Sequence, residues 1–162
     1  MSGPAGLSPA DLSVLIARLT GVAQEMGEVL RRAAFSPNIK ERADCSAALF
    51  TAGGTLLVQA EHIPVHLGSM PASVAAAIDA LGDEVAPGEQ VILNDPFAGG
   101  THLNDVTLVA PAFLDGSLIG WVGIRHSPLE VPIMAEAIGT VLIWIAMLYI
   151  GACLTTCPAA LR

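Results

Sequence analysis

One segment of the sequence concentrates side chains that could bind a metal ion. It runs from Asn94 to Asp105, with His102 three residues before Asp105 and Asp95 seven residues before His102. Imidazole and carboxylate groups together suit Zn²⁺ or Mn²⁺, because imidazole favours a borderline ion and carboxylates a harder one. Asp and Asn in loops rich in Gly and Pro also serve simply as turn caps, so a structural role is the alternative.

The run Gly99-Gly100-Thr101 in the same segment has the features of a substrate-binding loop. Glycine lets the backbone approach a ligand closely, and loops between strands often carry binding residues. The run lacks the lysine of a Walker loop, and the sequence contains no nucleophile elbow or dinucleotide fingerprint. If ATP takes part in the chemistry, another chain or domain must bind it.

Three further histidines are candidates. His126 follows the last expected strand, and it becomes a third metal ligand if that strand ends beside the His102 loop; otherwise it is an exposed strand-end residue. His62 and His66 are four residues apart, but Pro64 between them argues against a helix and its usual ligand spacing. Structural histidines are the favoured interpretation, and catalytic proton transfer is the alternative, since imidazole titrates near neutral pH.

The distribution of charge excludes one class of partner. The chain has 162 residues and a formal net charge of -8 at pH 7, and no Lys or Arg occurs between Arg42 and Arg125. Acidic residues recur over the same stretch, from Asp44 to Asp115. Nothing there would neutralise a phosphate backbone, so nucleic acid is a poor candidate partner.

Two helices are expected to position these residues. The first begins after Ser8, a capping residue, with Pro9 at the first helical position. Its apolar residues recur at helical spacing from Leu12 to Ala33. The second helix is predicted over residues 71–81, and Gly82 is placed to end it.

The strands are expected in hairpins rather than in alternation with helices. They are predicted over residues 47–50, 55–59, 91–93, 106–113 and 117–124. The glycines at 53–54 and the pair Asp115-Gly116 supply two tight turns. The pattern predicts an α+β fold, in which antiparallel hairpins form one mixed, largely antiparallel sheet.

The C-terminal segment 137–161 contains no charged residue. A buried core segment, or a tail that lost its packing partner, is the favoured interpretation, and a membrane anchor is the alternative. The N-terminus lacks the features of a signal peptide, and the three cysteines form neither a disulfide framework nor a CxxC pair. We therefore expect a cytoplasmic protein, with membrane association through residues 137–161 as the alternative.

Four stretches, in this order, resemble the hydantoinase B/5-oxoprolinase family, and within it the N-terminal segment of N-methylhydantoinase B-type subunits. They are SPNIKER at 36–42, HIPVHLGSM at 62–70, the run from NDP at 94–96 to GGTHL at 99–103, and DVTLVAP at 105–111. Each stretch is several residues long and unusual in composition. Together they extend the resemblance over roughly residues 8–125.

The resemblance implies an enzyme subunit of ring-opening amide chemistry. The family includes subunits of ATP-dependent hydantoinases, 5-oxoprolinases and acetone carboxylases of the alpha type. In these, a hydantoinase A-type partner uses ATP to activate the substrate oxygen, and the B-type subunit handles the activated intermediate. For this chain it implies a hydrolase subunit for small cyclic amides of hydantoin or 5-oxoproline type. His102 and Asp105 would be metal ligands, with Asp95 in or near the same site.

The chain departs from the family pattern in two places. Asn104 stands where the family usually has proline, and the family's paired-histidine motif, followed by an aspartate and glycines, is reduced to His126. The resemblance ends near Val131, although family members continue for several times this length. We expect a truncated family segment over 1–131 and a divergent apolar tail over 132–162. The alternatives to a hydrolase subunit are a non-catalytic assembly module of a split subunit and a membrane-tethered module.

Overall fold

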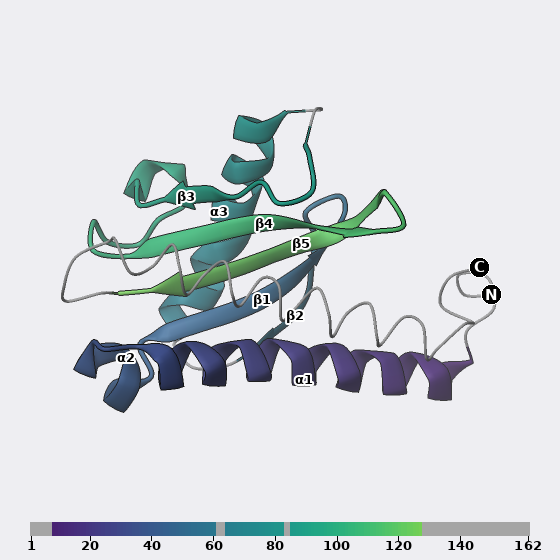
Figure 1. Ribbon diagram of the computed structural model, residues 1–162, viewed down its shortest axis with the longest axis horizontal. Helices are drawn as coiled ribbons and strands as arrows, with labels where there is room; N and C mark the ends of the chain where they lie inside the picture. Colours follow the sequence, from purple (N-terminus) through teal and green to yellow (C-terminus); the bar gives the residue numbers. More distant parts are fainter. Residues whose placement is uncertain (1–7, 61–63, 83–84, 128–162) are drawn as a thin grey trace.

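The computed structural model describes residues 8–60, 64–82 and 85–127. In chain order the elements are α1 (Pro9–Ala33), α2 (Pro37–Arg42), β1 (Cys45–Thr51), β2 (Leu56–Ala60), α3 (Pro64–Leu81), β3 (Val91–Leu93), the short 3-10 helix η1 (Pro96–Ala98), β4 (Val106–Leu114) and β5 (Ser117–His126). The strands form one sheet in the order β2-β1-β5-β4-β3, and each neighbouring pair is antiparallel. Figure 1 shows α1 along one face of this sheet and α3 on the other. The predicted α+β fold is confirmed.

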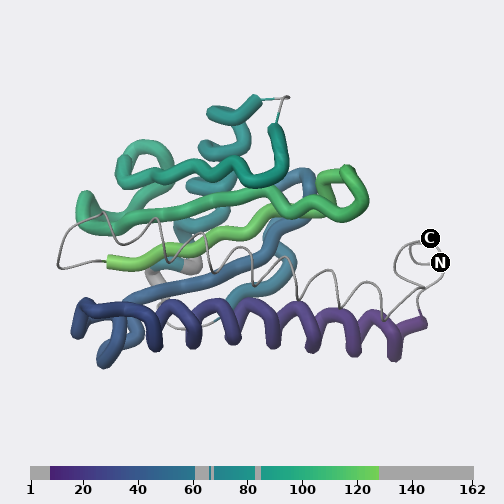
Figure 2. The backbone as a smooth tube through the Cα atoms, in the orientation of Figure 1, coloured from purple at the N-terminus to yellow at the C-terminus, as the bar shows by residue number. Residues whose placement is uncertain are grey.

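Helix α1 begins with the predicted cap. The hydroxyl of Ser8 accepts from the backbone N–H of Asp11, and the Asp11 carboxylate accepts from that of Ser8. The apolar stripe of the helix is buried only from Val22 onward, where it packs on β1 and β2. Leu12 and Ile16, nearer the N-terminus, are 46% and 49% exposed. This half of the helix extends past the strands (Figure 2).

Side chains alternate between the two faces of the sheet. Leu49, Val122 and Ile124 belong to an apolar cluster with α1, whereas Phe50 and Trp121 pack with α3. Strand β5 is central, since it pairs with both β1 and β4. The register of β5 therefore decides which residues of three strands lie side by side.

The start of α3 corrects the sequence prediction. Residues 62–70 were expected to form a loop followed by a helix from Pro71, but the helix begins at Pro64 and continues through Pro71. A proline at the first helical position lacks only an N–H that would have had no partner in the helix, so Pro64 starts the helix rather than preventing it. His66 consequently lies in the first turn of α3.

Two short helices were not predicted, α2 and η1. The apolar segment 137–161, for which a membrane anchor was the alternative interpretation, and the expected boundary at residue 131 lie outside the described residues. Among the residues that are described, none of the helices is long and apolar enough to cross a membrane.

Candidate functional site

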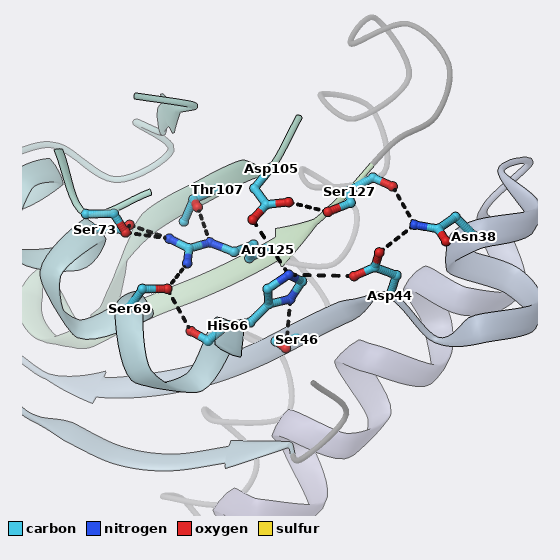
Figure 3. A network of polar contacts seen from close by, with 11 residues as sticks. Asn38, Asp44, Ser46, His66, Ser69, Ser73, Asp105, Thr107, Arg125 and Ser127 are labelled. Atoms are coloured by element: carbon cyan, nitrogen blue, oxygen red, sulfur yellow. Dashed lines mark hydrogen bonds and ion pairs between the residues drawn. The ribbon is translucent and has the colours of Figure 1, made fainter. Parts of the chain in front are cut away.

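A buried polar cluster lies between α3 and the ends of β1, β4 and β5 (Figure 3). Its centre is His66, whose Nδ1 lies 3.3 Å from the hydroxyl oxygen of Ser46 on β1. The other ring nitrogen, Nε2, lies 3.6 Å from Asp44 Oδ1 and 3.8 Å from Asp105 Oδ2. These two distances are too long for hydrogen bonds and describe a ring facing two carboxylates.

The imidazole of His66 is held in its neutral form. Burial lowers the pKa of His66, and the charges of Arg125 and His102 lower it further, against the opposing effect of Asp105 and Asp44. A neutral imidazole has one donor and one acceptor nitrogen. A proton on Nε2 suits the two carboxylates and leaves Nδ1 to accept the serine hydroxyl. His66 is therefore in the protonation state that a general base requires.

Asp44 is placed by the turn between α2 and β1. Ala43, which ends α2, has a left-handed φ of 54° and turns the chain so that Asp44 precedes the strand. The side-chain amide of Asn38 donates to Asp44 Oδ2 and also to the carbonyl oxygen of Ser127. Asn38 therefore links α2 to the end of β5 and holds the carboxylate of Asp44 at the edge of the cluster.

Asp105 is the most unusual group of the cluster. It is 1% exposed, and its Oδ1 accepts from the hydroxyl of Ser127. Its Oδ2 is buried and has no hydrogen-bond partner among the described residues. Leaving a buried polar atom without a partner costs about 1–3 kcal/mol, and more for a charged group. Such an atom is a candidate ligand for something that binds here.

Arg125 is fully buried on the same face of the sheet. Its Nε donates to the hydroxyl of Thr107 at 2.7 Å, and its Nη1 donates to the hydroxyl of Ser69. Nη2 donates to the hydroxyl of Ser73 and, at 3.0 Å, to the carbonyl oxygen of Gly99. Burial lowers the pKa of the guanidinium, and Asp105 opposes that shift. Its described hydrogen-bond partners are all uncharged.

The predicted substrate loop packs against α3. Gly99 has a φ of 84°, and a Cβ there would lie 2.4 Å from the backbone nitrogen of Ser73. A Cβ on Gly100 would lie 2.7 Å from the carbonyl oxygen of Asp95. The glycines are thus required for close packing. Thr101 Oγ1 is buried and has no hydrogen-bond partner within the described part of the chain, and substrate binding by residues 99–101 stays a prediction.

The structure separates two of the predicted metal ligands from the buried cluster. The carboxylate of Asp95 is exposed and caps η1, accepting from the N–H of Phe97 at 2.8 Å. The side chain of His102 is exposed as well, although it is near enough to affect the pKa of His66. The carbonyl of His102 accepts from the N–H of Asp105, which closes the turn between them.

His126 was a candidate metal ligand only if its strand ended beside the His102 loop, and an exposed strand-end residue otherwise. Its strand does end beside β4, and the side chain is buried rather than exposed. His126 lies opposite Val106 and Cys45 in the sheet. Alternation along β5 puts its ring on the α1 face, whereas Arg125 lies on the α3 face with His66. Its Nδ1 is buried and finds no hydrogen-bond partner in the ranges that the structure describes, and burial lowers the pKa of His126 to about 4. His62 lies outside the described residues.

Ser46, His66 and the two carboxylates resemble a nucleophilic triad, but a substrate has no access to the serine. Ser46 is 0% exposed, so no substrate could reach its hydroxyl without opening the fold. Its role is to bind the ring of His66. The arrangement therefore does not support covalent catalysis by Ser46.

Sequence reasoning missed Asp44, Ser46 and Arg125. The sequence held one signal for Arg125, since it is the only Lys or Arg between Arg42 and Arg162. A lone cation in so long a stretch is a candidate for a buried, specific role. Asp44 directly precedes a strongly apolar strand, which by itself distinguishes it little from other strand-end acids.

The donors present fit a divalent cation in their chemistry. Asp105 offers a buried oxygen without a partner among the described residues, and His66 Nε2 lies 3.8 Å from it and 3.6 Å from Asp44 Oδ1. Carboxylate and imidazole are ligands of Zn²⁺ and Mn²⁺. Within the ranges that the structure describes, however, no three His, Cys, Asp or Glu side chains are gathered closely enough to hold a metal ion. A cation would depend on side-chain adjustment or on donors from elsewhere.

Comparison with known proteins decides the family. The family model for hydantoinase B/oxoprolinase matches residues 8–131, which is most of the chain. The chain belongs to the hydantoinase B/oxoprolinase family. It is 42% identical over 120 residues to 5-oxoprolinase 1 of Arabidopsis thaliana, covering 74% of this chain and 10% of that protein.

Two solved structures share the fold. The ATP-dependent caprolactamase of Pseudomonas jessenii matches with a TM-score of 0.69 and 29% identity, over 75% of this chain and 21% of that one. A nucleotide-free acetone carboxylase matches with a TM-score of 0.63 and 26% identity, over 71% of this chain and 16% of that one. The chain therefore spans at most about a fifth of the length of these relatives.

Proposed function

We propose that this chain is part of a hydrolase subunit that acts on a small cyclic amide of hydantoin or 5-oxoproline type. An ATP-using partner of hydantoinase A type would activate the substrate. Asp105 and Asp44 would hold a divalent cation, Zn²⁺ or Mn²⁺, and the exposed side chain of His102 would have to turn toward them to complete the site. The observation that carries the proposal is the buried Asp105 carboxylate, whose Oδ2 lacks a hydrogen-bond partner and faces His66 Nε2 at 3.8 Å.

The names of the relatives support this reaction class. 5-Oxoproline and caprolactam are both cyclic amides, and the caprolactamase relative of Pseudomonas jessenii is a beta subunit, 31% identical over 115 residues. The solved caprolactamase and acetone carboxylase are both described as ATP-dependent. Because this sequence contains no phosphate-binding loop, a separate chain or domain would bind the ATP.

The residues of this chain would divide the work as follows. His66, neutral because it is buried, would accept a proton on Nδ1, the nitrogen that faces the hydroxyl of Ser46. Asp44 and Asp105 keep its ring oriented. A bound cation would polarise a carbonyl oxygen or lower the pKa of water. The backbone at Gly99 and Gly100 and the hydroxyl of Thr101 would contact the substrate.

Metal binding by the purified 162-residue chain tests the proposal. We expect near-stoichiometric Zn²⁺ or Mn²⁺ by elemental analysis and calorimetric titration, and loss of that metal in Asp105→Asn and in the double variant His102→Ala, Asp105→Ala. Asp95→Asn is the matched control, because its carboxylate is exposed in the same loop and already caps η1. His126→Ala in the same titration decides whether this residue is a ligand.

The second candidate is a non-catalytic assembly module. It is favoured by the geometry, since no three His, Cys, Asp or Glu side chains of the described residues are gathered closely enough to hold a metal ion. The two candidates differ in one outcome. Absence of metal from both the wild-type chain and the variants would support the assembly module and reject the hydrolase site.

A further inference from the structure

Arg125 combines three properties that a surface arginine does not have. It is the only Lys or Arg between Arg42 and Arg162, it is 0% exposed, and each of its three nitrogens donates a hydrogen bond. A buried guanidinium is costly unless its donors are satisfied. Several groups of the fold therefore hold this one guanidinium in place.

The partners of Arg125 come from three separate elements. Thr107 belongs to β4, Ser69 and Ser73 belong to α3, and Gly99 belongs to the loop after η1. The carbonyl of Gly99 receives a second hydrogen bond, from the hydroxyl of Ser73 at 2.6 Å. Figure 3 shows the guanidinium lying between Thr107 on one side and the two α3 serines on the other.

The backbone at Gly99 packs closely against α3. A Cβ at this position would lie 2.4 Å from the Ser73 nitrogen and 2.5 Å from the carbonyl carbon of Ala72, so the loop backbone touches the helix backbone directly. The two hydrogen bonds to the Gly99 carbonyl fix its direction as well as its position. The start of the segment that carries His102 is therefore attached to α3.

The end of the same segment is attached to the same strand end. Asp105 accepts from the hydroxyl of Ser127, which lies two residues after Arg125. The end of β5 thus holds the loop Gly99–Asp105 at both ends, through Arg125 at one and through Ser127 at the other.

We propose that Arg125 is a positioning residue: through the Gly99 carbonyl it fixes the loop Gly99–Asp105, and with it His102 and Asp105, relative to His66. The importance of this loop for chemistry rests on the proposed function, but the attachment itself does not. Lysine cannot replace arginine in this role, because an ammonium is a point charge without the guanidinium's planar fork of donors.

The test measures loop order separately from metal binding. Hydrogen exchange of the full chain is compared between wild type, Arg125→Lys and Arg125→Met. We expect exchange of the amides in 99–105 to rise about tenfold or more in both variants, since each hydrogen bond to a charged group is worth about that factor. Exchange in the β1–β2 hairpin should change far less. Wild-type loop exchange in Arg125→Lys would overturn the proposal, because charge alone would then suffice.

Two further variants keep the test decisive if Arg125 variants do not fold. Ser73→Ala removes one of the two donors to the Gly99 carbonyl and should raise loop exchange by a smaller factor; unchanged exchange would overturn the proposal. Trp121→Phe is the matched control, because it removes a hydrogen bond from Trp121 to Ala52 on the same face of β5, away from the loop. It should destabilise the fold without a selective rise in loop exchange, and a rise equal to that of Ser73→Ala would contradict the proposal.

Titration with Zn²⁺ separates this proposal from the proposed function. If the wild type binds the metal, Arg125→Lys should weaken binding about tenfold or more, and an unchanged affinity would count against positioning. If the wild type binds none, the cation site fails, and the exchange results alone decide the role of Arg125.

Discussion

The two faces of the sheet surround their buried polar groups with different partners. Cys45 and His126 are register partners on the α1 face, and burial keeps both uncharged: it raises the pKa of the Cys45 thiol to about 11 and lowers the pKa of His126 to about 4. Arg125, one residue before His126, is 0% exposed on the α3 face, and it makes four hydrogen bonds.

The two faces differ in the hydrogen-bond partners that they offer and not in how deeply they bury a group, since Cys45 is also 0% exposed. Helix α3 brings the hydroxyls of Ser69 and Ser73 against the sheet, and the strands add Ser46 and Thr107. On the α1 face, the cluster around the same strand ends is apolar. At these strand ends the α1 face is apolar, whereas the α3 face supplies hydroxyls that hold a buried charge.

The largest expected effect comes from removing a side chain on the apolar face. Ile124→Ala should lower the free energy of unfolding by about 2–5 kcal/mol, because the side chain is 2% exposed and a cavity would remain. Urea denaturation measures the loss. Ile92→Ala on β3, which is 47% exposed, is the control and should cost less than about 1 kcal/mol. Equal losses would contradict the assignment of Ile124 to the buried core and of Ile92 to an exposed position on β3.

The second effect is acid destabilisation through His126. The pKa of His126 is about 4 in the folded chain and has its ordinary value of 6.5 in the unfolded chain, so the unfolded state binds the proton more readily. Stability is therefore unaffected by this residue above pH 6.5 and falls as the pH drops from 6.5 to about 4, by about 3 kcal/mol at most.

Denaturation at several pH values checks the prediction for His126. In His126→Leu, which places an apolar side chain on the apolar face, this part of the pH dependence should disappear. Titration of carboxylates remains in both proteins, so the difference between them isolates the histidine. If the free energy of unfolding changed with pH in the same way for both proteins, the ring of His126 would not be desolvated in the folded chain.

The apolar face is also the part that the sequence predicts best. The stripe from Leu12 to Ala33, the cap at Ser8 and the hairpin turn at Asp115-Gly116 are local signals, and the structure confirms each of these elements. Both Asp115 and Gly116 have positive φ, at 49° and 78°, as a two-residue hairpin turn requires. The start of α3 was wrong because Pro64 was interpreted as a helix breaker rather than a first residue.

The polar face could not be predicted in the same way, because it depends on contacts between distant residues. Ser46 and Arg125 become neighbours only because β5 lies between β1 and β4. His66 meets Asp105 only because α3 crosses the end of β4. The sequence identified Asp105, His66 and the glycine loop as candidates, but it gave no order of strands from which their distances follow.

A smaller effect should come from the polar face. Ser46→Ala removes the hydroxyl 3.3 Å from His66 Nδ1 and leaves that buried nitrogen without its partner, which should cost about 1–2 kcal/mol of unfolding free energy. Ala48→Ser, which changes the next residue of β1 on that face, tests the other direction: it adds a hydroxyl within the apolar part, among Phe50 and Val74. This change should lower the free energy of unfolding, because the added hydroxyl would lie among apolar side chains without a hydrogen-bond partner. If neither change altered the free energy of unfolding, this face would not have distinct polar and apolar ends.

The smallest expected effect lies on the half of α1 that extends past the sheet. Ile16 and Met26 belong to one helical stripe, but Ile16 is 49% exposed and Met26 is 0% exposed. Ile16→Ala should change the free energy of unfolding by no more than about 0.5 kcal/mol, because little burial is lost and alanine favours the helix. Met26→Ala should cost about 2–5 kcal/mol, and both values come from the same urea titration. A comparable loss at Ile16 would mean that this half of the stripe is covered in solution, so that periodicity in the sequence would report burial along the whole helix.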